Sequence, residues 1–221
     1  MSEMMSKPKV LTSDPNVMHK IKFLQFRRQI LPLAAVVIFM AINVIWPEKI
    51  VLYLTIASFG WYLVERILFR TKNKIAAPVA GAFVSPVDGK VQSVRKGADS
   101  TLITLNKSFL DVVELRLPYP DLQTEIVNNW NFETPLGQVN VRVKANKIEY
   151  FDNKNIHGSV IGVMPGNGII TIHIPSSINV LVSEKQSVFG GESELFLFEV
   201  PAAEEPKPRS ILVEVPINDL T

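Results

Sequence analysis

The sequence contains no cysteine, which excludes disulfide bonds, thiol nucleophiles and cysteine-ligated metal sites together. Histidine is also scarce, and its three copies lie far apart without a recognisable zinc-binding pattern, so we expect no metal site. These copies are His19, His157 and His173. His173 alternates with isoleucines in a strand-like segment, which favours a half-exposed strand residue over a catalyst.

Acidic residues are few in the first part of the chain, although the whole sequence carries a net charge of only +2. Residues 1–82 contain 11 Lys and Arg but only 4 Asp and Glu. Residues 83–221 reverse this balance, with 12 basic and 17 acidic residues. The first part is therefore basic and apolar, whereas the second part has the composition of an acidic soluble domain.

Two long runs without any charge dominate the basic part. Residues 30–46 (ILPLAAVVIFMAINVIW) form a run of 17, and residues 50–64 (IVLYLTIASFGWYLV) form a run of 15. A bilayer core of about 30 Å needs about 20 helical residues, and apolar flanks lengthen both runs toward that value. We therefore expect a membrane-anchoring helical hairpin over residues 20–74; a buried helix pair of a soluble protein is the alternative.

Basic residues lie at the outer ends of the two uncharged runs, within the expected hairpin. Because such residues are retained in the cytoplasm, both outer ends are expected there, in an inner (cytoplasmic) membrane. The N-terminus and the domain after the hairpin are then cytoplasmic. These residues are Lys20, Lys22, Arg27 and Arg28 before the first uncharged run, and Arg66, Arg70, Lys72 and Lys74 after the second.

Beyond the hairpin, short alternating segments are separated by Pro, Gly, Asn and Asp, a pattern typical of a β sandwich or barrel. Expected strands cover 90–94, 101–105, 112–117, 138–143, 148–151, 169–174, 179–182 and 195–200. The fold class is thus a membrane hairpin followed by a mainly β domain, with an N-terminal arm at 1–19 and the β domain at 83–200. Residues 201–221 are expected to form a Pro-rich linker and a final strand at 211–215.

Two segments of the β domain, 85–94 and 179–200, look like the half-motifs of biotinyl- and lipoyl-type sandwiches. Those domains carry their cofactor on a lysine between methionines at a hairpin tip. This sequence has no such lysine, so covalent carriage of biotin or lipoate is not expected.

The order of these features resembles that of one known family. The exit LFRTK (68–72) and the turn SPVDGKV (85–91) stand where the family has approximately F-F-R-D-P and S-P-A-D-G-K-V. Near the carboxyl end, IGVMPGNGIITIHIP (161–175) keeps the spacing of the family pattern I-G-M-I-R-F-G-S-R-V-D-V-Y-L-P. From about residue 28 to about residue 200 the chain is similar to the short membrane-anchored bacterial phosphatidylserine decarboxylases, with a sandwich of their kind as the implied fold.

This resemblance implies that the family's chemistry is lost. In the family a serine attacks the carbonyl before it, the chain breaks, and the new terminus becomes a pyruvoyl group that binds the substrate amine. That serine aligns with Gly168, so no pyruvoyl cofactor is expected. The family's histidine aligns with Val113 after a slip of one or two residues, and valine cannot move a proton. Asp88 matches the family's aspartate, although an Asp-Gly pair is also ordinary turn chemistry.

Neighbouring residues do not restore the missing groups. Ser176 and Ser177 lie so far along the strand, at about 3.3 Å per residue, that they cannot reach the turn. The Asn167-Gly168 pair could form a succinimide, which leads to deamidation and not to a pyruvoyl group. We therefore interpret residues 166–168 as a glycine-rich reversal that needs positive φ.

The function expected from these observations is that of a pseudoenzyme: a non-catalytic scaffold or accessory subunit of a membrane complex. One alternative is an active decarboxylase that converts phosphatidylserine to phosphatidylethanolamine with displaced catalytic residues. Another is a membrane-fusion adaptor, but residues 95–160 lack the heptads that such proteins carry.

The expected partners are the membrane and either other proteins or further copies of the chain, with no nucleic acid. Anionic phospholipid is a candidate ligand for Arg66, Arg70, Lys72 and Lys74, at about 1 kcal/mol per basic residue near the surface. The alternative is that these charges only fix the orientation of the hairpin.

Overall fold

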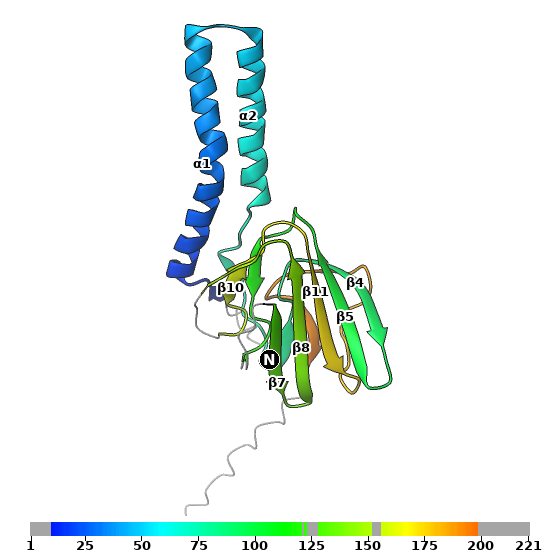
Figure 1. The fold of residues 1–221 in the computed structure, drawn as a ribbon. Coiled ribbons are helices and arrows are strands. Elements are labelled where there is room, and N and C mark those ends of the chain that lie inside the picture. Colours follow the sequence, from blue (N-terminus) through cyan, green and yellow to red (C-terminus); the bar gives the residue numbers. More distant parts are fainter. Residues whose placement is uncertain (1–9, 121, 123–127, 152–155, 199–221) are drawn as a thin grey trace, which may run out of the picture.

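The computed structural model describes residues 10–120, 122, 128–151 and 156–198, and it consists of a helical hairpin joined to a mainly β domain (Figure 1). Helix α1 (Pro15–Ile45) and helix α2 (Lys49–Leu68) pack side by side and project away from the strands. Both are long and apolar enough to cross a membrane. Only 11% and 6% of their most apolar windows are buried, unlike the core helices of a soluble protein.

Helix α1 begins earlier than the expected hairpin boundary at residue 20. The Asp14 side chain accepts a hydrogen bond from the Asn16 N–H at 2.8 Å, and Pro15 occupies the first helical position, where its missing N–H costs nothing. Before the helix, strand β1 (Val10–Thr12) pairs antiparallel with β2 (Lys74–Ala76). Residues 10–19, expected to be part of an arm, are thus folded against the exit of the hairpin.

The largest sheet has six antiparallel strands in the order β12-β4-β5-β11-β8-β7. Its central strand β11 pairs along its whole length with β5 and over six residues with β8. The alternation of apolar and polar residues that predicted these strands also decides which face is buried. The strands are β4 (Gly89–Lys96), β5 (Ser100–Lys107), β7 (Asn129–Thr134), β8 (Gly137–Ala145), β11 (Gly168–Pro175) and β12 (Ser187–Val188).

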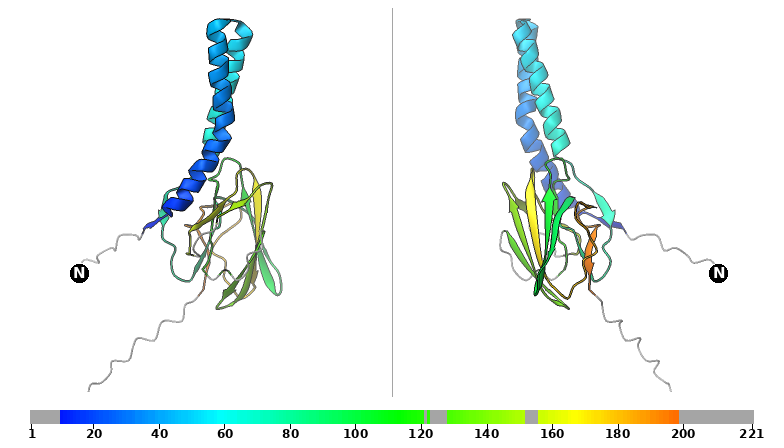
Figure 2. Two further views of the ribbon diagram at one scale, coloured as in Figure 1. Left: turned by 60° about the vertical axis from the view of Figure 1, so that its left-hand side comes forward. Right: turned by 90° about the vertical axis from the view of Figure 1, so that its right-hand side faces the viewer.

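Two smaller sheets face the inner side of the large sheet, and Figure 2 shows the two layers edge-on. One has the order β6-β10-β9 and the other pairs β13 with β3. The core between the layers contains Phe83 from β3 stacked on Phe196 from β13, with ring centroids 4.6 Å apart. The strands are β3 (Ala82–Val84), β6 (Glu114–Arg116), β9 (Glu149–Tyr150), β10 (Val160–Val163) and β13 (Glu194–Leu197).

The predicted mainly β domain is therefore confirmed, with several differences in its strands. The sequence did not predict β1, β2, β3, β7, β10 or β12. The expected strand at 179–182 contains only an isolated bridge between Val180 and Phe196. The expected linker and final strand at 201–221 lie outside the described residues. A backbone that leaves the ladder after one bridge cannot be distinguished from a strand by apolar residues alone.

Candidate functional site

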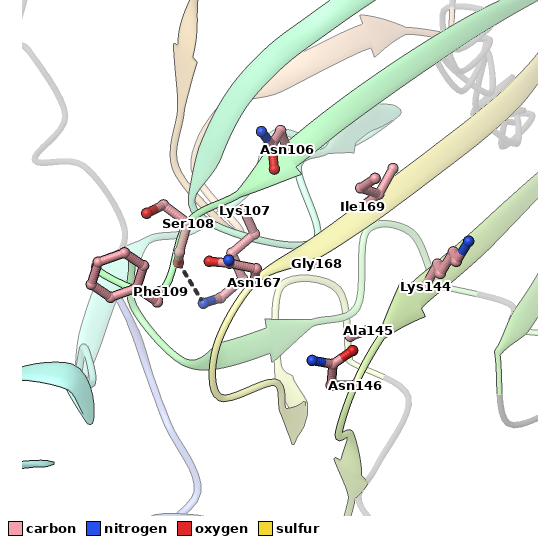
Figure 3. Close-up of a pocket in the computed structure, with 10 residues that line it drawn as sticks. All are labelled: Asn106, Lys107, Ser108, Phe109, Lys144, Ala145, Asn146, Asn167, Gly168 and Ile169. Atoms are coloured by element: carbon pink, nitrogen blue, oxygen red, sulfur yellow. Dashed lines mark hydrogen bonds between the residues drawn. The ribbon is translucent and has the colours of Figure 1, made fainter.

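Three neighbouring strands of the large sheet have an end on the side nearest the hairpin (Figure 1). Gly168 starts β11 and lies opposite Lys107, the last residue of β5, and opposite Ala145, the last residue of β8. An open pocket lies at this junction, and Figure 3 shows its lining. The pocket is lined by Asn106, Lys107, Ser108, Phe109, Lys144, Ala145, Asn146, Asn167, Gly168 and Ile169.

Gly168 is buried and extended at the start of β11, so the chain reverses just before it. Positive φ occurs at Gly166, with a value of 95°, which confirms the predicted glycine-dependent reversal at that residue. A Cβ at Gly168 would lie 2.7 Å from the Met164 sulfur. The space that a serine side chain would need is therefore filled by a flexible methionine.

Val113 is fully buried in an apolar cluster where the hairpin meets the β domain. Val17 and Ile21 of α1 and Phe69 after α2 contribute to this cluster from the hairpin side. The Val113 N–H donates to the carbonyl of Arg70 at 3.0 Å, and its carbonyl accepts from the N–H of Met164 at 2.7 Å. Val113, which aligns with the family's histidine, thus packs against the end of the hairpin that adjoins the β domain.

Asp88 joins three separate segments of the chain. Its Oδ1 accepts a hydrogen bond from the Gly190 N–H at 2.7 Å, and its Oδ2 lies 3.1 Å from the Lys72 Nζ. The same ammonium group lies 3.9 Å from a Glu192 carboxylate oxygen and 4.7 Å above the centroid of the Phe189 ring. These contacts give Asp88 a structural role that goes beyond its own turn.

The pocket also contains a buried amine that the sequence did not lead us to single out. The Lys107 Nζ donates to the carbonyls of Ser108 and Gly166 at 3.2 and 3.1 Å. Burial lowers the pKa of Lys107 to about 8, and the nearby carboxylates of Asp111 and Asp88 partly oppose this effect. The missed signal is the alternation itself, since Ile103, Leu105 and Lys107 all point inward from β5.

The four basic residues at the end of the hairpin, which are candidate lipid contacts, have different surroundings. Arg70 donates a hydrogen bond to the Leu110 carbonyl, and Arg66 donates to the Tyr62 hydroxyl at 3.3 Å. Lys72 is occupied by its ion pair with Asp88, whereas Lys74 is exposed on β2. Lys72 therefore has the least freedom of the four to contact a lipid.

A buried ion pair fixes the backbone of this exit segment. The Arg116 guanidinium pairs with Glu114 and also donates to the carbonyls of Gly158 and Lys72, each at 3.0 Å. Glu114 in turn accepts from the Lys72 N–H at 2.7 Å. Burial raises the pKa of Glu114, and the charge of Arg116 opposes this rise. Both charged side chains are paired and hydrogen-bonded, so we assign the pair a structural role in positioning the chain.

The three positions singled out in the sequence come together in space. Met164 connects two of them, because its N–H binds the Val113 carbonyl and its side chain fills the space beside Gly168. Asp88 is close enough for its charge to act on Lys107 at the pocket. Within the described ranges, no group of three His, Asp or Glu side chains is placed to hold a metal ion.

The chain was compared with protein-family models, with curated proteins and with solved structures, and none of them matches it. The site must therefore be interpreted from its own residues and geometry.

Proposed function

We propose that this protein is a membrane-anchored, non-catalytic relative of the short bacterial phosphatidylserine decarboxylases, with a β sandwich of their kind. It acts as a scaffold or accessory subunit of a membrane complex in the cytoplasmic membrane. Its hairpin holds the β domain on the cytoplasmic face, where the domain recruits protein partners or further copies of itself.

One observation carries this proposal: the positions aligned with the family's reactive groups are used for packing. Val113 contributes hydrocarbon to the cluster at the foot of the hairpin, and Met164 fills the space beside Gly168. A peptide bond breaks by this route only when a hydroxyl attacks its carbonyl and a base takes the proton. Neither group is present at the aligned positions.

The remaining polar groups near the turn support the same conclusion. The Ser108 hydroxyl accepts a hydrogen bond from the Leu110 N–H at 3.4 Å, so it is engaged within its own loop. Ser176 and Ser177 follow Pro175, which pairs with Ser100 at the opposite end of β11 from Gly168. Along a strand this separation is about 3.3 Å per residue, which excludes attack on the turn.

The direct test is the mass of the full chain purified from native membranes with its partners. The expected result is one uncut polypeptide of 24.7 kDa that co-purifies with specific membrane subunits and does not decarboxylate phosphatidylserine in mixed micelles. Two fragments separated near residue 168, with a pyruvoyl group blocking the second, would overturn the proposal. An uncut chain that is recovered without any partner would retain the pseudoenzyme and reject the scaffold.

A further inference from the structure

The loop that connects β5 to β6 exposes two large apolar side chains in succession. Phe109 and Leu110 each keep 48% of their surface accessible to solvent. The loop lies at the end of the β domain that faces the hairpin (Figure 1), and Phe109 lies at the edge of the pocket in Figure 3. Adjacent exposed apolar residues on a soluble surface often mark a site of interaction.

Hydrogen bonds within the loop hold this tip in a defined shape. The Ser108 N–H donates to an Asp111 carboxylate oxygen at 2.7 Å, and the Leu110 N–H donates to the Ser108 hydroxyl at 3.4 Å. The polar side chains of the loop are therefore turned toward its own backbone. Its two apolar side chains remain available to an external partner.

The loop is also tied directly to the exit of the hairpin. Arg70 donates a side-chain hydrogen bond to the Leu110 carbonyl, and its own carbonyl accepts from Val113 at 3.0 Å. Arg70 follows the end of α2 at Leu68 by only two residues. At 1.5 Å per residue, the 20 residues of α2 are about 30 Å long, which matches the hydrocarbon thickness of a bilayer. With α2 across a bilayer, the loop tied to Arg70 would lie beyond Glu65 and Arg66, on the side of the headgroups.

The surroundings of the loop have the chemistry of a membrane interface. Ile169 is an exposed apolar residue at the same pocket, and Lys144 adds an exposed positive charge. Apolar side chains combined with basic residues bind the interfacial layer, where the former enter the acyl boundary and the latter attract anionic lipids. This combination is continuous with the hairpin through Arg70.

We propose that Phe109 and Leu110 insert into the interfacial layer of the same bilayer that holds the hairpin. The β domain then contacts the membrane at two points, the helix ends and this loop. Two points fix the tilt of the domain and place the pocket beside Lys107 at the depth of the lipid headgroups. The proposal uses only the hairpin and the loop, so it does not depend on the proposed loss of catalysis.

The natural absence of cysteine makes the test simple, because one introduced thiol is the only labelling site. Full-length Phe109→Cys protein is labelled with a polarity-sensitive fluorophore and reconstituted into vesicles of phosphatidylcholine and phosphatidylglycerol. The matched control is Leu136→Cys, which lies 41% exposed in the turn between β7 and β8. That turn is at the far end of β8 from the pocket, at roughly 30 Å by the strand rise.

The label at position 109 is expected to be quenched by lipids with a nitroxide near the headgroup and to be several-fold less accessible to aqueous iodide than the label at position 136. Equal iodide quenching at the two positions would overturn the proposal. Shielding in native membranes that disappears in pure lipid vesicles would also overturn it, in favour of a protein partner at the loop.

Discussion

Lys107 places an amine at the buried end of β5, and this residue adds a dependence on pH to the stability of the protein. The pKa of Lys107 falls from 10.5 to about 8 on folding, because burial disfavours the charged form. Between these values the unfolded chain binds more protons than the folded chain, so stability rises with pH. The full cost of burial applies below pH 8 and is on the order of 3 kcal/mol, at about 1.4 kcal/mol per pKa unit.

We predict that Lys107→Met removes this rise in stability between pH 8 and pH 10.5. The measurement is denaturant unfolding of the full chain in detergent, followed by the fluorescence of the buried Trp130 with Trp46 and Trp61 replaced by Phe. The variant also leaves the carbonyls of Ser108 and Gly166 without this donor, so its stability at one pH is less informative than the slope.

Lys144→Met is the matched control, because Lys144 is an exposed lysine at the same pocket. It should keep the slope of the parent protein. If Lys107→Met and the parent gave the same dependence between pH 8 and pH 10.5, the assignment of this effect to Lys107 would be rejected.

Gly168 leads to a second prediction at the scale of one residue. Gly168→Ser supplies the hydroxyl that the family uses, but Val113 still offers no base and Met164 must move to make room. We therefore predict that the variant stays uncut, as judged by intact mass after prolonged incubation. Ile169→Ser, which adds a hydroxyl at an exposed neighbouring position, is the control. Cleavage of Gly168→Ser alone would show that the reactive machinery survives.

At the scale of elements, helix α1 of the hairpin packs against strand β10 of the β domain. The N-terminal part of α1 precedes the uncharged run and buries Val17 and Ile21 against Val160 and Val163 of β10. This cluster, together with the Arg116–Glu114 pair, makes the exit of the hairpin part of the domain instead of a free linker. The hairpin and the domain are therefore expected to move together.

Ile21→Ala tests this connection. Truncation of a buried aliphatic side chain typically costs about 2 to 5 kcal/mol, and the loss should appear as local opening. We expect amide hydrogen exchange in β10 to become roughly thirtyfold faster or more, since 1.4 kcal/mol corresponds to a factor of ten. Phe23→Ala, which removes a side chain that is 60% exposed on the same helix, should leave that exchange nearly unchanged. Similar exchange in both variants would exclude a docked hairpin.

The elements also show what the sequence can and cannot predict. Regular alternation predicted β5, β8 and β11, and the uncharged runs predicted both helices, because each pattern is local. Strand β1 has only three residues, and it exists because β2 lies beside it after the hairpin has closed. A pairing that joins residues 62 to 66 positions apart leaves no periodic signal in either segment.

In the candidate site, too, local motifs could be predicted from the sequence and distant contacts could not. Asp88, Val113 and Gly168 were selected from spaced motifs, and the structure brings them to one end of the sheet. Lys107 was missed because the expected strand ended at Leu105, although the inward alternation continues for one more step. A charged residue at an inward position contradicts the usual pattern of a core strand. Of its two carbonyl partners, Ser108 is the next residue, but Gly166 comes from a distant segment that sequence alone does not place nearby.

At the scale of the whole molecule, the charge distribution predicts the orientation of the chain in a membrane. Basic residues gather at the two outer ends of the hairpin. Between the two uncharged runs, the only charged residues are Glu48 and Lys49. Because positive residues resist translocation, we predict that this turn faces away from the cytoplasm and that the β domain stays inside. In this orientation the acidic domain lies beside an anionic membrane surface. Its basic exit segment holds it there.

Single-cysteine labelling in intact cells checks this orientation. Glu48→Cys is suitable because the Glu48 side chain makes no capping hydrogen bond to α2, and Leu136→Cys marks the far end of the β domain. A membrane-impermeant maleimide should label position 48 in intact cells or spheroplasts, and position 136 only after permeabilisation. The reverse pattern would place the pocket and the 108–111 loop on the opposite leaflet, and any cytoplasmic partner of the domain would be excluded with it.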